Sequence, residues 1–570
     1  MTHGNKPLRG LESAAQSSIQ TGKFGRLFRW LPSSFQPTNT KEEKEVEELL
    51  DELAHVMVSA EFDDRLDKEN EKSPDVDINT HEDEDENRDI PAGYTYLGQF
   101  IDHDITFDPA SSLQQQNDPD ALEDFRTPRL DLDSLYGRGP DDQPYFYELR
   151  EKDQPQERVK FLLGPNCGVN DQYRPDLLRT EDKTALIGDK RNDENKIVSQ
   201  IHALFLRFHN KVFDDLGRLS SPAESPRFSN DHSRFLETQR IVRWCYQWIV
   251  LNDYLPKICR DDIVNSIMPE ICNEDAKDII PGEGRREPNF KFYEAKSGEA
   301  FMPVEFSVAA FRFGHSMVRP SYSLNEVTLK SDTNPEFTSK QGKKRKFARI
   351  PIFVAQSQHD KDALNGFGQP LPLDWGIDWS FFFGDIPREP KKGRQVPQPS
   401  YRIDATLVDP LGKLPEFVQD LGPDSPFISL AFRNLMRGFR MGLPSGQAVA
   451  RMMGLKVKEV LTDDELWSRK GKGDGTEVWP EGQAFFSDHQ RWLEGRAPLW
   501  FYILKEAELH EKGHRLGKVG SRIVAETLIG LAWFDHYSYL FQAPHWNPGM
   551  EKIVGLDKDL DMLKLTKYVG

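Results

Sequence analysis

The strongest constraint on the fold is a helical repeat of apolar residues in the middle of the chain. The segment NKIVSQIHALFLRFHNKVFDDL at 195–216 sets apolar side chains along one stripe: Ile197, Ile201, Leu204, Phe208 and Val212. Residues at this spacing share one face of an α-helix, and that face must be buried. The segment ETQRIVRWCYQWIVLNDYL at 237–255 follows the same pattern. Two such segments predict a body built mainly of helices.

The rest of this body divides into further helical patterns and long connections. Helices are expected at 303–317, 427–441, 445–454, 498–511 and 518–542. The two-residue alternation that marks half-buried strands is scarce. The Pro- and Gly-bearing segments 318–400 and 465–485 are expected to be large connections. We therefore predict a mostly α-helical fold, one large domain with few short strands and long connecting loops.

The N-terminal part of the chain differs from this body. We predict an N-terminal arm and acidic linker over 1–92 and the helical domain over 93–570. The acidic run DVDINTHEDEDENRD has too few apolar side chains to offset the entropy of ordering it. The basic-aromatic patch KFGRLFRW at 23–30 could contact a membrane or a partner, and we favour packing against the body.

Composition excludes several classes of function. The formal net charge is −19, whereas a nucleic-acid partner requires a basic surface. The dense basic cluster GKKRK at 342–346 is expected to be a solvated loop. No stretch approaches the ~18 apolar residues of a transmembrane helix, and the first thirty residues lack the apolar core of a secretory signal. The expected location is the cytoplasm, with leaderless export left open. None of the four cysteines has C-x-x-C spacing, so neither a disulfide framework nor a thiolate metal site is expected.

One short apolar stretch contains three adjacent polar residues. In GQFIDHDITF at 98–107, an aspartate stands on each side of His103. If 97–105 is helical, Asp102, His103 and Asp104 fan across about 200° of its surface and face three different neighbours. Gln99 lies one turn before His103, on the same face. Burying these groups requires polar, charged or metallic partners. Read alone, the motif also fits surface aspartates around a satisfied core histidine.

The pattern G-Q-F-x-D-H-D resembles the distal haem motif of the animal-type haem peroxidases, within the peroxidase-cyclooxygenase superfamily. Four further segments resemble the family in its order: TPRLDLDSLYGRGP at 127–140, GDKRNDE at 188–194, FRFGHSMVRP at 311–320 and RNLMRGFRMGLPSG at 433–446. The chain is thereby identified as a member, similar to the myeloperoxidase and lactoperoxidase group. The missing disulfides and signal sequence indicate a bacterial relative. The resemblance implies haem b as cofactor.

On the distal side of the haem, the resemblance implies three catalytic residues. His103 would be the base, with Arg191 and Gln99 beside it. Asp102 and Glu194 match the two carboxylates that the family esterifies to haem methyl groups, so two ester bonds are expected. A further sulfonium bond is not expected, because Asn195 stands where some members have methionine.

On the proximal side, the resemblance implies that His315 ligates the haem iron. Asn434 would accept the Nδ1 proton of His315, an outer-shell bond that fixes the tautomer of a ligating histidine. Arg312, three residues before His315, and Arg437 would each bind a haem propionate through charge-assisted hydrogen bonds.

A calcium site is also implied. In 127–133, alternate residues direct oxygens to one side of an extended or looped backbone, and calcium takes six to eight oxygens. The resemblance assigns side-chain ligands to Asp104, Thr127, Asp131 and Asp133, and mainly the main-chain carbonyl to Arg129. Alternating aspartates are also common in turns.

The implied function is a peroxidase that reduces hydrogen peroxide and oxidises small anionic donors, halide or thiocyanate, or phenols. His103 would take and return the peroxide proton, and Arg191 would stabilise the developing negative charge. One alternative is a fatty-acid dioxygenase of the same superfamily, which needs a tyrosine where this chain has Arg312. The other is a non-catalytic, calcium-dependent binding protein on the same fold.

Overall fold

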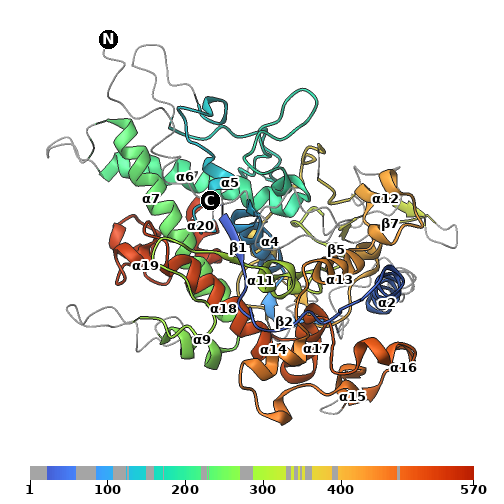
Figure 1. Cartoon of the computed structure of the whole chain (residues 1–570). Coiled ribbons are helices and arrows are strands. Elements are labelled where there is room, and N and C mark those ends of the chain that lie inside the picture. Colours follow the sequence, from blue (N-terminus) through green and yellow to red (C-terminus); the bar gives the residue numbers. More distant parts are fainter. Residues whose placement is uncertain are drawn as a thin grey trace.

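Figure 1 shows the computed structural model of the chain. It describes residues 22–58, 85–106, 123–124, 128–148, 159–170, 172–219, 228, 230–269, 287–328, 336–338, 344–346, 349–353, 363–366, 368–387, 396–470 and 476–570. Within these residues the fold is mostly helical with few, short strands, which confirms the predicted class. No helix of the described residues is long and apolar enough to cross a membrane.

Three helices pack together around α6 (Lys196–Leu219), which contacts both α4 (Gly93–Ile105) and α7 (Asp231–Ile249). The predicted stripe of α6 is buried along its whole length, from Ile197 to Val212. Phe100 of α4 stacks on Phe205 of α6 with ring centroids 5.1 Å apart, so the two helices meet through aromatic side chains. Helix α7 continues through a π-helical turn, η4 (Val250–Tyr254), into α8 (Leu255–Ile258). Such turns are frequent at functional sites.

A second group of helices packs against η6 (Ala310–His315), a 3₁₀-helix. The helices of this group that contact η6 directly are α11 (Val304–Val308), α17 (Leu499–Glu511) and α18 (Lys518–Trp533). Two more, α13 (Leu430–Arg440) and α14 (Gly446–Met452), pack on α17. The single helix expected at 303–317 is wrong, because Ala309 leaves the helical region (φ −128°, ψ −69°). In the 3₁₀ turn that follows, residues three apart eclipse each other, so Arg312 and His315 share a face.

The helix expected at 518–542 is also shorter than predicted. It ends at Trp533, and a separate helix, α19 (Tyr539–Gln542), follows. In between, the Asp535 carboxylate accepts the Tyr537 N–H at 3.0 Å. Ser538 caps α19 by accepting the Phe541 N–H at 3.1 Å. Short polar side chains that bond nearby main-chain groups compete with a continuous helix.

Part of the predicted N-terminal arm is packed on the body. Strand β1 (Gly22–Gly25) pairs with β3 (Glu123–Asp124) and with β4 (Met302–Pro303). Phe24 and Phe28 of the basic-aromatic patch are buried. Helix α2 (Thr40–Met57) packs on α13. Strand β2 (Glu86–Pro91), which contains the end of the acidic run, pairs with β9 (Pro399–Tyr401).

The remaining elements are short. The other strands are β5 (Ser321–Tyr322) with β8 (Ile350–Pro351), β6 (Glu336–Thr338) with β7 (Lys344–Lys346), and β10 (Ser468–Lys470) with β11 (Thr476–Val478). Residues 344–346 of the basic cluster are thus a strand rather than the expected loop. The other helices are α5 (Asp133–Tyr136), α9 (Asp261–Ile267), α12 (Pro415–Leu421), α15 (Asp463–Leu466), α16 (Pro480–Leu493) and α20 (Met562–Val569). Short 3₁₀-helices are η2 (Pro144–Phe146), η3 (Lys190–Asp193), η9 (Trp379–Phe381), η10 (Asp409–Gly412), η11 (Pro426–Ile428), η12 (Val457–Glu459) and η13 (Pro548–Glu551).

The start of α4 is held by the aromatic run at 379–383. The Gly93 N–H donates to the Phe382 carbonyl at 3.0 Å. A Cβ at residue 93 would lie 2.5 Å from that oxygen, so this close approach requires glycine. Trp379, Phe382 and Phe383 are buried in the core. The contact fixes where α4 begins and therefore where the residues at its other end, near His103, lie.

Candidate active site

One cavity of about 410 Å³ brings together the residues predicted on both faces of a haem. Its wall includes all of the predicted haem-site residues except Asn434: Gln99, Asp102, His103, Arg191, Glu194, Arg312, His315 and Arg437. They come from α4, η3 and the residues that follow it, η6 and α13. Asn434 lies behind His315 and contacts its ring.

His103, in the last turn of α4, is buried with 4% of its surface exposed. Its Nδ1 lies 2.9 Å from the side-chain oxygen of Asn192, and its Nε2 lies 3.9 Å from a carboxylate oxygen of Glu194. Burial, with the nearby charge of Arg191, lowers the pKa of His103 to about 4. The imidazole is therefore neutral near pH 7. Because Asn192 accepts the Nδ1 proton, Nε2 carries the lone pair and can act as a base.

Arg191 is held rigidly at the C-terminal end of α4. Its guanidinium pairs with the Asp189 carboxylate at 2.7 Å. It also donates to the main-chain carbonyls of His103 at 3.0 Å and Thr106 at 2.6 Å. The Asp189 carboxylate accepts the Arg191 N–H as well, which starts η3. Asp189 was not among the predicted site residues, although its place two residues before Arg191 in the motif was a signal that could have found it.

Gln99 lies on the cavity side of α4, as expected, and bonds to groups other than His103. Its amide donates to the Glu194 carboxylate at 3.1 Å and accepts from Asn195 at 3.1 Å. Asp102 also lines the cavity, and one of its carboxylate oxygens accepts from the Thr106 hydroxyl at 3.2 Å. The two carboxylates predicted to form esters therefore face the same space.

His315 ends η6 on the other side of the cavity. Its Nδ1 lies 2.8 Å from the Asn434 side-chain amide on α13. The amide nitrogen faces the ring; a 180° rotation of the amide would place its oxygen there, where it accepts the Nδ1 proton and leaves the Nε2 lone pair for a metal. Burial, followed by the charge of Arg312, lowers the pKa of His315 to about 3, so this imidazole is neutral too.

The residues of the cavity fit a haem. A haem is a flat apolar ring with two carboxylates and an iron that takes nitrogen ligands. Beside His315, a Cβ added to Gly314 would meet no atom within 4 Å, so a flat group can lie against this face. Arg312, Arg433 and Arg437 line the cavity and can pair with carboxylates. Apolar side chains form the remaining wall: Val318, Ile352, Phe353, Leu411, Leu414, Phe417 and Leu430.

Three tyrosines that the sequence analysis did not single out also line the cavity: Tyr94, Tyr96 and Tyr254. The hydroxyl of Tyr94 bonds to the buried carboxylate of Asp253 at 2.7 Å. Tyr96 precedes His103 by two helical turns, so helical spacing was a signal that could have placed it on the same side of α4. Tyr254 comes from η4, which sequence spacing does not relate to α4.

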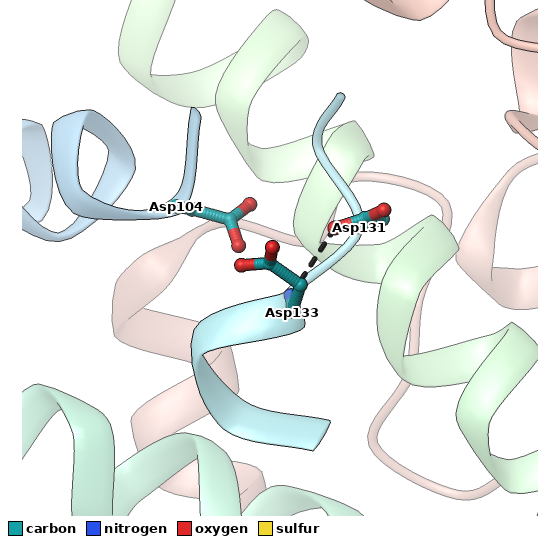
Figure 2. A group of neighbouring side chains, drawn as sticks. All are labelled: Asp104, Asp131 and Asp133. Carbon is teal, nitrogen blue, oxygen red and sulfur yellow. Dashed lines mark hydrogen bonds between the residues drawn. The ribbon is translucent and has the colours of Figure 1, made fainter. Parts of the chain in front are cut away.

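An acidic cluster, Asp104, Asp131 and Asp133, lies where the end of α4 meets the start of α5 (Figure 2). Oxygens of Asp104, Asp131 and Asp133 all lie within 4.8 Å of one another. Between the last two, Leu132 adopts a left-handed conformation (φ 55°), which is uncommon for a branched side chain. The Leu132 N–H donates to Asp104 at 3.2 Å.

The other two predicted calcium ligands are Arg129 and Thr127. The Arg129 side chain lies near Asp535, with Nε 3.8 Å from a carboxylate oxygen. Thr127 lies outside the described residues. Three close carboxylates are the kind of donor set that a hard cation prefers.

Comparisons with known proteins find similarity to animal haem peroxidases. The family model described as "Animal haem peroxidase" matches residues 124–365. Human eosinophil peroxidase is 25% identical over 309 residues, covering 52% of this chain and 34% of that protein. Mouse myeloperoxidase is 26% identical over 314 residues, covering 52% and 34%. The chain thus spans about a third of the length of these relatives.

Among solved structures, the fatty acid alpha-dioxygenase of Oryza sativa has a TM-score of 0.51. It is 12% identical and the match covers 85% of this chain and 74% of that chain, which supports a shared fold. This likeness concerns the fold alone. The match to the family model over residues 124–365 and the two peroxidase relatives show that this chain is similar to the animal haem peroxidases.

Proposed function

We propose that this chain is a haem peroxidase that reduces hydrogen peroxide and oxidises halide, thiocyanate or phenolic donors. The observation that carries the proposal is one cavity with a neutral imidazole on each side, each bonded at Nδ1 to a side-chain amide. Asn192 bonds to His103, and Asn434 bonds to His315.

Different residues of the chain would bind the cofactor and transfer the proton. His315 would hold the cofactor iron through Nε2, and Arg312 and Arg437 would bind its two propionates. When bound, haem would supply the electrons that reduce the peroxide. His103 Nε2 takes one proton from hydrogen peroxide and returns it to the departing oxygen, which leaves as water. Arg191 is already fixed by Asp189, so its charge can favour that departure without reorganisation.

The same cavity supports two covalent links to the cofactor. Asp102 and Glu194 both line it, and the Gln99 amide holds the Glu194 carboxylate. We propose that both form ester bonds when the holoprotein is treated with peroxide. Acid-acetone extraction tests this. Haem that leaves the peroxide-treated protein freely would show that neither bond formed.

We also propose that calcium binds at the acidic cluster. Asp104, Asp131 and Asp133 would supply carboxylate oxygens, and Arg129 its main-chain carbonyl. Thr127 would complete the side-chain ligands. Calcium would then brace the helix that carries His103, because Asp104 is the next residue.

The decisive test of the peroxidase proposal uses the full chain loaded with haem. A Soret band and peroxide-dependent oxidation of a phenol and of bromide are expected. His315→Ala should lose haem, and His103→Ala should keep haem but react with peroxide about 10²–10⁴-fold more slowly. His489→Ala is a matched control, because this histidine bonds to Glu52 away from the cavity and should leave the rate unchanged. Fast peroxide reaction in His103→Ala would refute the assigned base.

A fatty-acid dioxygenase is the second candidate, and two observations favour keeping it. The rice dioxygenase shares the fold, and three tyrosines line the cavity although none stands at position 312. Oxygen uptake with an unsaturated fatty acid, lost in a Tyr94, Tyr96 or Tyr254→Phe variant, would support this activity. A non-catalytic calcium-binding protein would instead bind calcium and show no Soret band after haem loading.

A further inference from the structure

We propose that Asn192 and His202 form a buried relay that holds His103 in the tautomer whose Nε2 lone pair faces the cavity. The inference rests on the proposed peroxidase function, because it concerns the proton chemistry of His103. It assigns positioning roles to two residues that do not line the cavity.

The relay is one side-chain amide placed between two imidazoles. The Asn192 oxygen lies 2.9 Å from Nδ1 of His103, and its nitrogen lies 3.0 Å from Nδ1 of His202. Asn192 is fully buried and His202 has 1% of its surface exposed. Phe100 of α4 lies edge-on to the His202 ring at 6.1 Å, which limits the space in which that ring can move.

Hydrogen-bond chemistry links the two histidines. An amide oxygen can only accept and an amide nitrogen can only donate. With the oxygen toward His103, Nδ1 of His103 must carry its proton, and Nδ1 of His202 must accept. If the amide rotated by 180°, both tautomers would reverse, and Nε2 of His103 would carry a proton and could not act as a base. The tautomers of His202 and His103 are therefore coupled through the orientation of one amide.

Replacing Asn192 or His202 should slow proton transfer to His103 without abolishing it. In Asn192→Leu, no group fixes the Nδ1 proton of His103. In His202→Leu, the amide nitrogen of Asn192 is buried without its acceptor, which costs free energy. Rotation or displacement of the amide then lowers that cost. Asn192→Asp differs, because a carboxylate accepts from both rings and keeps the Nδ1 proton on His103.

Cyanide association with the ferric, haem-loaded full chain measures the base without turnover. Hydrogen cyanide binds iron as the anion, so a neighbouring base must take its proton. At a fixed pH near 7, Asn192→Leu and His202→Leu should each bind cyanide at least about tenfold more slowly. The loss should not exceed the ~10²–10⁴-fold that acid-base catalysis contributes as a whole. The Asn192→Leu/His202→Leu double variant should be no slower than either single variant, because both act through one amide.

Two variants separate the relay from simple packing. Asn192→Asp should bind cyanide at close to the wild-type rate, and adding Asn192→Asp to His202→Leu should restore the rate. The matched control is His209→Leu. His209 lies two turns further along α6, is fully buried, and bonds to Tyr136 and to the Val159 carbonyl rather than to the site. It should be less stable to heat but bind cyanide at an unchanged rate.

The outcomes distinguish this inference from the proposed function. If His103→Ala slows cyanide binding but Asn192→Leu and His202→Leu do not, the relay is refuted and the assigned base stands. If Asn192→Asp is as slow as Asn192→Leu, the effect is packing and the relay is refuted. If His103→Ala itself binds cyanide at the wild-type rate, the proposed distal base fails. Should Asn192→Leu fail to hold haem, the comparison of His202→Leu with its Asn192→Asp double variant decides.

Discussion

Asp133→Asn should change thermal stability in opposite directions with and without calcium. Oxygens of Asp104, Asp131 and Asp133 lie within 4.8 Å of one another, so their charges repel when no cation is bound. At that separation, two unit charges repel by about 1 kcal/mol in bulk water and about 3.5 kcal/mol at an effective dielectric constant of about 20. Asp133 takes part in two such pairs, so removing its charge relieves about 2 to 7 kcal/mol.

This free energy corresponds to a measurable change in Tm. An unfolding entropy of about 2.1 cal/mol/K per residue, applied to 570 residues, converts it to a rise of about 2 to 6 °C in chelator. With calcium present, the same substitution removes a charged ligand and weakens binding. The stabilisation by the ion, RT ln(1 + [Ca²⁺]/Kd), then falls below that of the wild type.

The assay is thermal unfolding of wild type and variant, in chelator and in millimolar calcium. Asp141→Asn is the matched control, because Asp141 is exposed and lies outside the cluster. Its effect on the free energy of unfolding should stay within about 0.5 kcal/mol in both buffers. A shift of the same sign in both buffers for Asp133→Asn would refute the calcium assignment, and so would the absence of any calcium effect on the wild type.

Three further predictions test how the site is supported. Glu305 is buried and accepts the N–H groups of Leu27 and Phe28 at 3.1 and 3.2 Å. Glu305→Leu should therefore lower the free energy of unfolding in urea by about 1–3 kcal/mol per unsatisfied group, and an unchanged midpoint would contradict this. Gly93→Ala should lower Tm because its Cβ would lie 2.5 Å from the Phe382 carbonyl; a neutral effect would mean that α4 starts differently.

The third prediction concerns pH. Burial raises the pKa of Asp253 from 3.8 to about 6, so the folded state holds this proton more tightly than the unfolded chain. The resulting stability is present below pH 3.8 and is lost as the pH rises through about 6. Asp253→Asn should flatten the pH dependence of unfolding free energy across this window, and an unchanged slope would refute it.

Local patterns in the sequence were sufficient for much of the fold. The apolar stripe from Ile197 to Val212 predicted α6, and every stripe residue is buried. Spacing failed where the backbone changed helix type: Ala309 interrupts the segment that ends at His315, although the apolar pattern continues through it. Periodicity reports which face of a segment is apolar, and it does not report whether each residue can keep helical dihedral angles against its neighbours.

The candidate site, like the fold, was predicted only in part from the sequence. The motifs that contain His103, Arg191 and His315 selected these residues through their joint resemblance to a family, because each motif read alone also fits an ordinary structural role. The partners of these residues come from distant parts of the chain: Asn192 is 89 residues from His103, and Asn434 is 119 residues from His315. The sequence carried the second of these pairs only through a family resemblance, and it carried no sign of the first.

The sequence by itself determined the helical class, the imidazoles and carboxylates available for chemistry, and the acidic loop. Only the tertiary structure decided which amide meets which imidazole, that three tyrosines share the cavity, and that Asp189 holds Arg191. The physical reason is that the interactions involved act over different separations along the chain. Helix propensity and apolar spacing act between residues a few positions apart, whereas hydrogen bonds depend on distances of about 3 Å, which are set by how separate helices pack.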